Sequence, residues 1–107
     1  MLRLTQLPAG RYLCRQIIWG DETGIRKAGL YYLETENNRV VLYPFDRERA
    51  NTPFIEGAVI LLNSSLNHAL MHYAKSSANP HEFALLCNQN GYIANLYSSN
   101  CVALHCQ

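Results

Sequence analysis

Residues 28–45 have the sequence AGLYYLETENNRVVLYPF, in which two strand-forming stretches flank Asn37 and Asn38. Asparagine tolerates the left-handed backbone conformation that both central positions of a type I′ turn require, so we predict a β-hairpin with a two-residue turn. Glu36 and Arg39 then face each other as an opposite-charge pair that closes the turn. We interpret the rest of the chain as covering or extending this hairpin.

The turn also predicts the register of the hairpin, because side chains alternate between the two faces of a strand. One face is largely apolar and is predicted to point toward a core; it pairs Thr35 with Val40, Leu33 with Leu42, and Tyr31 with Pro44. The other face is polar near the turn and aromatic farther away; it pairs Glu34 with Val41, Tyr32 with Tyr43, and Leu30 with Phe45. Burial of Leu33 and Leu42 on one side tests this register.

The composition is that of a single folded domain over residues 1–107. Hydrophobic residues make up 49% of the chain and charged residues 16%, which argues against disorder. Nine basic and eight acidic residues are scattered along the chain and give a net charge of +1. Proteins that bind nucleic acids usually carry concentrated basic charge, so we expect no nucleic-acid partner.

The sequence also predicts a cytoplasmic protein without a membrane partner. No apolar run approaches the roughly 20 residues that span a bilayer, and the start, MLRLTQLPAGR, lacks the apolar segment and cleavage site of a signal peptide. Four cysteines lie in or beside apolar runs, so we expect reduced thiols in the core rather than disulfides. They are Cys14, Cys87, Cys101 and Cys106.

The first half of the chain is predicted to be a three-stranded meander followed by a buried strand. Residues 1–10 form an entry segment, residues 11–19 a first strand, and residues 20–24 a loop that leads into the hairpin. Pro44 marks an edge or a strand end, because proline cannot donate a hydrogen bond to a ladder. The charged residues 46–53 are expected to be a solvated loop, and the apolar residues 58–63 a strand buried on both faces.

The second half is predicted to contain one helix and a second meander. Residues 64–78 show helical spacing, with an apolar stripe on one face and His68, His72 and Lys75 on the other; Ser64 or Ser65 caps the start, and Asn79-Pro80 ends it. We then expect strands over residues 81–87 and 92–97 joined by a hairpin turn at Asn90-Gly91, a turn at 98–100, and a terminal strand over 101–106.

We predict no cofactor and no catalytic centre, and a metal site that uses His68, His72 and a cysteine is only a third hypothesis. His68 and His72 have the i,i+4 spacing of zinc ligands, but the helix has no carboxylate and Lys75 shares their face. In a strand, Cys101 and His105 would share a face but lie about 13 Å apart, too far to bind one ion. No glycine-rich phosphate loop is present, and no base other than His105 lies beside a cysteine.

The surplus of aromatic residues points instead to an interaction surface. Seven tyrosines and one tryptophan are too many to bury with every polar group satisfied. We therefore predict an exposed surface for a protein partner or a second copy of the chain, and we assign to it Trp19, Tyr32, Tyr43 and Phe45.

The order of strands and turns in the first half resembles the small β-subdomain that flanks amidohydrolase barrels. The segments that carry this resemblance are residues 24–33, 39–45 and 54–61. The sequence has no His-x-His motif at a strand end and no barrel to hold further ligands. The resemblance therefore implies a stand-alone or accessory β-domain, and it assigns no catalytic residue.

Together these patterns predict a mainly β protein, an antiparallel sandwich or open barrel of about six or seven strands with one short helix. The function we expect is that of a non-catalytic interaction or accessory module that self-associates or binds a protein partner. The alternative is a small-ligand-binding protein or enzyme with a pocket between sheet and helix, lined by tyrosine and histidine.

Overall fold

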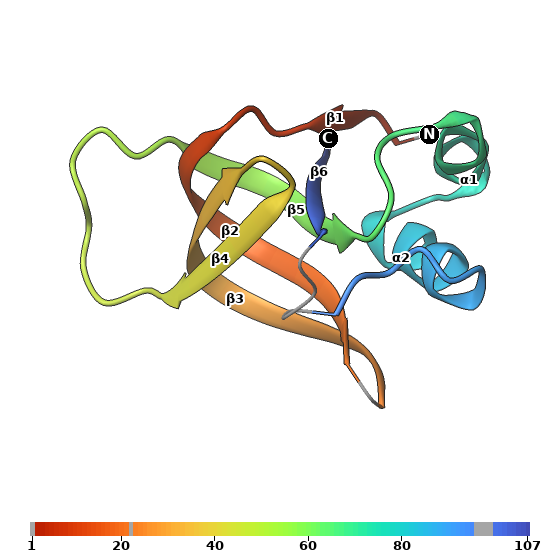
Figure 1. Cartoon of the computed structure of the whole chain (residues 1–107), viewed down its shortest axis with the longest axis horizontal. Coiled ribbons are helices and arrows are strands. Elements are labelled where there is room, and N and C mark those ends of the chain that lie inside the picture. The colour runs from red at the N-terminus through yellow and green to blue at the C-terminus, as the bar shows by residue number, and fades with distance from the viewer. Residues whose placement is uncertain (1, 22, 96–99) are drawn as a thin grey trace.

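A single mixed sheet with two helices at one end makes up the computed structural model, which describes residues 2–21, 23–95 and 100–107 (Figure 1). The strands are β1 (Leu4–Gln6), β2 (Gly10–Asp21), β3 (Gly24–Glu36), β4 (Arg39–Pro44), β5 (Phe54–Leu62) and β6 (Val102–Cys106). The helices are α1 (His68–Ser76) and α2 (Pro80–Gln89). The prediction of a mainly β protein is confirmed, and the sheet order is β1-β6-β5-β2-β3-β4.

The central hairpin has the predicted turn and register. Asn37 and Asn38 have φ angles of 51° and 62°, as a type I′ turn requires. Every predicted pair from Glu36–Arg39 to Tyr31–Pro44 is present in the β3–β4 ladder. Leu33 is fully buried and packs in the same apolar cluster as Leu42, so the predicted core-facing side is confirmed. In the described residues, however, Glu36 and Arg39 form no ion pair.

The sheet differs from the predicted antiparallel sandwich in two ways, while an open barrel, the other predicted form, also has unpaired edge strands. The six strands of the described residues belong to one sheet, whose edges β1 and β4 do not pair with each other. In addition, β5 runs parallel to its neighbour β2. The reason is the connection at residues 45–53, which carries the chain from β4 past β3 and β2 to the far side of β2. Period-two patterning does not contain this information, because it does not fix strand order.

The buried residues form two clusters on opposite faces of the sheet, and β5 contributes to both. Its side chains alternate between the clusters, as predicted for a strand buried on both faces. We call the cluster under the hairpin the inner cluster; it contains Cys14, Ile17, Leu33, Ile55, Val59, Leu61 and Ala103. We call the other the helix cluster; its largest members are Ile18, Ile60, Leu62, Leu70, Phe83 and Leu104.

Helix α1 lies inside the predicted helical segment but begins later than expected. Asn67 is the N-cap in place of Ser64 or Ser65, and its side-chain oxygen accepts a hydrogen bond of 3.1 Å from the Leu70 N–H. Leu70 and Ala74 are buried against the sheet. His68, His72 and Lys75 are exposed on the opposite face, as predicted.

The predicted strand over residues 81–87 is wrong, because this segment belongs to α2. Asn79 caps the helix by accepting a 3.0 Å hydrogen bond from the Glu82 N–H, and Pro80 occupies the first helical turn. The Glu82 carboxylate in turn accepts a 2.7 Å hydrogen bond from the Ala78 N–H. Asparagine, proline and a glutamate three residues after the cap are a helix-start signal, which here outweighs the apolar run that follows.

The predicted hairpin turn at Asn90-Gly91 is also wrong, since these residues end α2. Gly91 has a φ of 80°, and its N–H donates to the Asn88 carbonyl at 3.1 Å. The Tyr92 N–H donates to the Cys87 carbonyl at 2.8 Å, which completes a Schellman motif. Asparagine-glycine favours positive φ in helix caps as well as in hairpins, so the dipeptide alone does not distinguish them.

The end of the chain agrees with the prediction only at its last strand. Of the predicted strand over 92–97, the described part forms isolated bridges, Ile93 with Leu62 and Asn95 with Gly20. Leu96, Tyr97 and most of the predicted turn at 98–100 lie outside the described residues. The terminal strand is confirmed as β6, which also pairs with β1 from the predicted entry segment.

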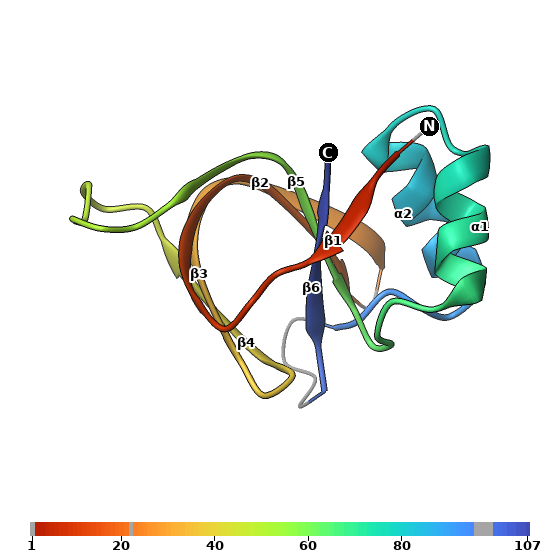
Figure 2. The ribbon, with the colours of Figure 1, turned by 90° about the horizontal axis from the view of Figure 1, so that it is seen from above.

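The two helices and the 45–53 loop lie at opposite ends of the molecule (Figure 2). The helices cover the helix cluster, and α2 also contacts β3, whose Ile25 packs against that cluster. In the described part of the chain, neither helix is long and apolar enough to cross a membrane.

Candidate interaction surface

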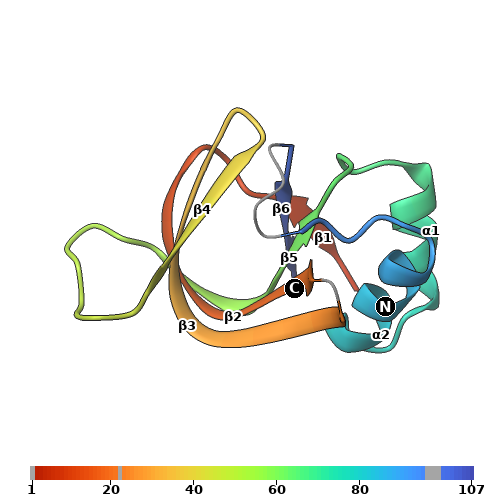
Figure 3. The same ribbon diagram turned by 60° about the horizontal axis from the view of Figure 1, so that its bottom comes forward.

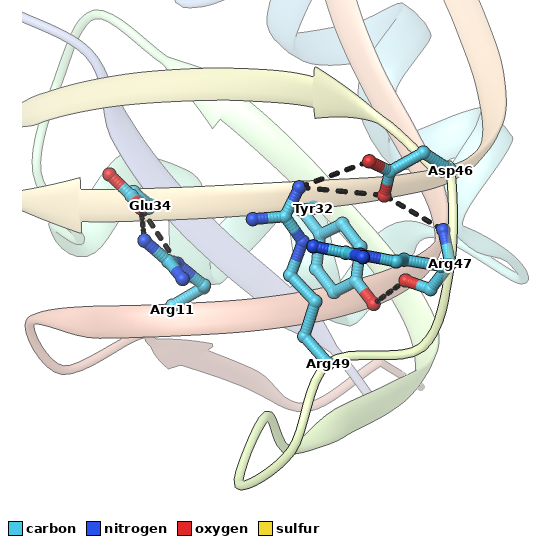
Figure 4. A network of polar contacts seen from close by, with 6 residues as sticks. All are labelled: Arg11, Tyr32, Glu34, Asp46, Arg47 and Arg49. Atoms are coloured by element: carbon cyan, nitrogen blue, oxygen red, sulfur yellow. Dashed lines mark hydrogen bonds and ion pairs between the residues drawn. The ribbon is translucent and has the colours of Figure 1, made fainter.

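Tyr32 holds the 45–53 loop against the outer face of the hairpin (Figure 4). Its hydroxyl donates a 2.5 Å hydrogen bond to the Arg47 carbonyl oxygen, and the Arg49 guanidinium lies 5.0 Å from the centre of its ring. The Phe45 ring stacks on it at a centroid distance of 5.9 Å. These contacts leave Tyr32 only 1% exposed. Our assignment of Tyr32 to the exposed interaction surface is therefore corrected: the chain's own loop covers it.

Asp46 organises the start of this loop. Its carboxylate accepts a hydrogen bond of 2.8 Å from the Arg47 N–H and lies 3.3 Å from Nη2 of Arg49. The Arg47 N–H, and then the charge of Arg49, lower the pKa of Asp46 below its ordinary value. The far end of the loop is joined to β2 by a 2.9 Å hydrogen bond from the Leu13 N–H to the Pro53 carbonyl. As predicted, the loop is exposed to solvent.

An open groove of about 800 Å³ lies between this loop and the turn end of the hairpin. An ion pair between Arg11 and Glu34 lies along it, with Arg11 Nε 2.7 Å from the carboxylate. Glu36, Arg39, Val41 and residues 50–52 are among the other residues that line it. Its described lining contains no tyrosine and no histidine, which differs from the pocket that the ligand-binding alternative requires.

A group of exposed apolar side chains lies beside residues 46–53 on the same face. We call this group the outer patch; it consists of Leu30, Val41, Tyr43, Phe45 and Phe54, which are 37–50% exposed. The β-ladders place Phe54, Leu13, Tyr32 and Tyr43 in one row across β5, β2, β3 and β4. Side chains directly opposite in adjacent strands share a face, so Phe54 and Tyr43 lie on the same face, with the loop-covered Tyr32 between them.

The four residues assigned to the surface from sequence are therefore not in one place. Tyr43 and Phe45 are exposed members of the outer patch, 42% and 37% exposed. Trp19 is half-buried and packs against the inner cluster, on the opposite face of the sheet. Sequence reasoning missed Leu30 and Val41, although the hairpin register already placed them beside Phe45 and Tyr43. Phe54 was not predictable, because its position depends on the parallel pairing of β5 with β2.

The histidines and cysteines do not assemble a reaction centre in the described residues. No group of three His, Cys, Asp or Glu side chains there is close enough to hold a metal ion, and His68 and His72 are exposed on α1. Burial raises the pKa of Cys14, Cys87 and Cys106 to about 12, so these thiols stay protonated and weakly nucleophilic at neutral pH.

The remaining two candidates lie at the last strand. Cys101 is buried, and its thiol donates a 3.2 Å hydrogen bond to the Asn95 carbonyl. Burial lowers the pKa of His105, which favours its neutral form. The outer patch and the adjoining groove are thus the candidate functional surface of the described residues.

No protein-family model, curated protein or solved structure shows significant similarity to this chain.

Proposed function

We propose that this chain is a protein-interaction module that self-associates through the outer patch. One observation supports the proposal most strongly. Of the seven large hydrophobic side chains that are exposed in the described residues, five belong to the outer patch, and only Met71 and Leu85 lie elsewhere, on the helices. Soluble monomers seldom gather exposed apolar side chains on one face, and such patches mark contact sites.

The polar groups beside the patch also suit a protein contact. The Arg11–Glu34 pair and Arg39 lie in the groove next to Val41, so charged and hydrogen-bonding groups border an apolar centre. Protein interfaces typically have this composition, with an apolar core and a polar rim. An accessory role, as the amidohydrolase resemblance implies, would use the same kind of exposed face.

The ligand-binding alternative has weaker support. It calls for a pocket between the sheet and a helix, and the helix cluster occupies this space with Leu70 and Phe83, both fully buried. The groove beside the outer patch is open, and its lining mixes charged and polar side chains with a few apolar ones. Drug-sized ligands usually bind in concave, mostly apolar sites, so this groove suits the edge of a protein contact better.

The test is sedimentation velocity on the full chain and two matched variants. Tyr43 and Met71 are 42% and 39% exposed, so Tyr43→Lys and Met71→Lys introduce the same charge at similarly exposed sites. We expect the unmodified chain and Met71→Lys to sediment as a dimer at high concentration, and Tyr43→Lys to remain a monomer with an unchanged circular dichroism spectrum. A monomeric unmodified chain at every soluble concentration, or equal loss of the dimer in both variants, contradicts the proposal.

A further inference from the structure

We infer that two copies associate by antiparallel pairing of their β4 strands, about a two-fold axis that passes through Val41. This inference rests on the proposed self-association and specifies its geometry. The occupant of the outer patch is then a second copy of the same chain. Three features of β4 support this arrangement: its unused backbone groups, the position of its proline, and the side chains that its exposed edge brings together.

The first feature is that β4 lies at the edge of the sheet and, among the described strands, pairs with β3 alone, although it also approaches β6 (Figure 3). The Phe45 N–H donates to the Leu30 carbonyl at 3.3 Å, so Tyr43 and Val41, at alternate positions, also bond toward β3. The backbone N–H and C=O of Val40 and Leu42 therefore point away from the sheet. In the described residues, neither residue makes a hydrogen bond outside the hairpin ladder.

The second feature is Pro44, which selects among the symmetric registers. An axis through Leu42 would place Val40 opposite Pro44 of the other copy, where the proline has no N–H to donate and its ring faces a carbonyl. An axis through Val41 pairs Val40 with Leu42 of the other copy, twice. All four outward N–H groups then find carbonyl acceptors, and Pro44 stays outside the ladder. The Val41 axis is therefore the favoured register.

The third feature is the side chains that this register brings together on the outer face. Val41 meets Val41 of the other copy, and Arg39 meets Tyr43 at both symmetric positions. Arg39 is exposed and forms no ion pair in the described part of the chain, while 42% of Tyr43 is exposed. A guanidinium over a tyrosine ring is attractive, and both apolar patches become continuous across the axis.

The register is tested by disulfide formation in full-length cysteine variants. Directly opposite residues in a non-hydrogen-bonded pair have Cα atoms about 4.5 Å apart, which lies within the range of about 4.4–6.8 Å found in disulfides. Val41→Cys should therefore form an intermolecular disulfide with itself, which doubles the mass on a non-reducing gel. Tyr43→Cys is the matched control: it should not cross-link alone, but should do so when mixed with Arg39→Cys. The unmodified chain measures the background from the buried native cysteines.

The outcomes separate this inference from the proposed function. If the unmodified chain is a dimer in solution but Val41→Cys cross-links no faster than Tyr43→Cys, the β4 register is wrong and self-association stands. If the unmodified chain is monomeric, the proposed function fails, and the register fails with it. Cross-linking of both Val41→Cys and the Arg39→Cys plus Tyr43→Cys mixture supports the register, since the two results depend on different pairs.

Discussion

Tyr32 shows how one side chain decides which part of the outer face is exposed. Its hydroxyl and ring hold the 45–53 loop through Arg47 and Arg49, so the loop covers the middle of the face and leaves Tyr43 and Phe45 exposed on β4 and just beyond its end. A tyrosine hydroxyl at a β-strand position predicts a polar partner when the residue is buried, but sequence does not say which partner it has. Here the partner is the Arg47 carbonyl oxygen, 15 residues later in the chain.

We expect Tyr32→Phe to lower the free energy of unfolding by about 1 kcal/mol, the usual contribution of one hydrogen bond. The ring contacts with Phe45 and Arg49 remain in this variant. Tyr43→Phe is the control, because the Tyr43 hydroxyl has no hydrogen bond in the described residues and its removal should change little. Urea unfolding measures both. Equal midpoints for Tyr32→Phe and the unmodified chain would show that the hydroxyl does not hold the loop.

A second prediction at this scale concerns Asp21, at the turn between β2 and β3. Its carboxylate accepts hydrogen bonds from the Thr23 hydroxyl at 2.7 Å and from Arg26, and also from the Thr23 N–H at 2.8 Å. These bonds, in that order, lower the pKa of Asp21 from 3.8 to about 2. A lowered carboxyl pKa stabilises the fold above the unfolded pKa, and the stabilisation is lost as the pH falls toward the folded value.

The Asp21→Asn variant should therefore be less stable than the unmodified chain at neutral pH. The difference should shrink as the pH falls from about 4 to about 2, because the original carboxylate becomes protonated over this interval. Urea midpoints measured at several pH values give the comparison. A difference that stays constant across this range would show that Asp21 acts through its shape and not through its charge.

At the level of helices and strands, local sequence signals predicted the structure where that structure depends on one element alone. The hairpin register followed from Asn37 and Asn38, because a two-residue turn fixes both strands. The α2 segment was wrongly predicted as a strand, because its apolar run suits a strand as well as a helix. The capping residues Asn79 and Glu82 indicate a helix. The parallel β5 could not be read from its own residues, since strand order depends on a connection that crosses two strands.

The β2–β5 pair contains an irregularity that a mutation can test. Its register shifts between Cys14–Ile55 and Gln16–Ala58, so Glu56 and Gly57 together face Arg15 as a β-bulge. A side chain at position 57 would overlap the Cys106 carbonyl oxygen and press on His105. The backbone of β6 is held on both sides by β1 and β5, so it has little room to move.

Gly57→Ala should therefore destabilise the protein by roughly 1–3 kcal/mol, the cost of overpacking a tight site. Gly29→Ala in β3 is the matched control, because a methyl group there meets no atom within 4 Å. Thermal or urea unfolding of both variants measures the difference. If Gly57→Ala were as stable as Gly29→Ala, the close approach of β5 and β6 at this point would be wrong.

In the molecule as a whole, the helices and the 45–53 loop cover parts of the sheet, and the parts that they leave exposed form the outer patch. Both helices pack on the helix cluster at one end, and the 45–53 loop lies at the other end (Figures 1 and 2), where it covers Tyr32 on the same face. Composition predicted that aromatic side chains would remain exposed. Which ones do so depends on the helices and the loop, and the sequence pattern placed neither relative to the sheet.

The most direct test of self-association through the outer patch is a dilution series followed by NMR on isotope-labelled chain. We predict that the backbone amide signals of Val41, Tyr43 and Phe45 shift with concentration along one binding curve, while those of Met71 and Leu85 stay fixed. Signals that are independent of concentration throughout, or shifts centred on the two helices, would contradict the assignment of the outer patch as the contact surface.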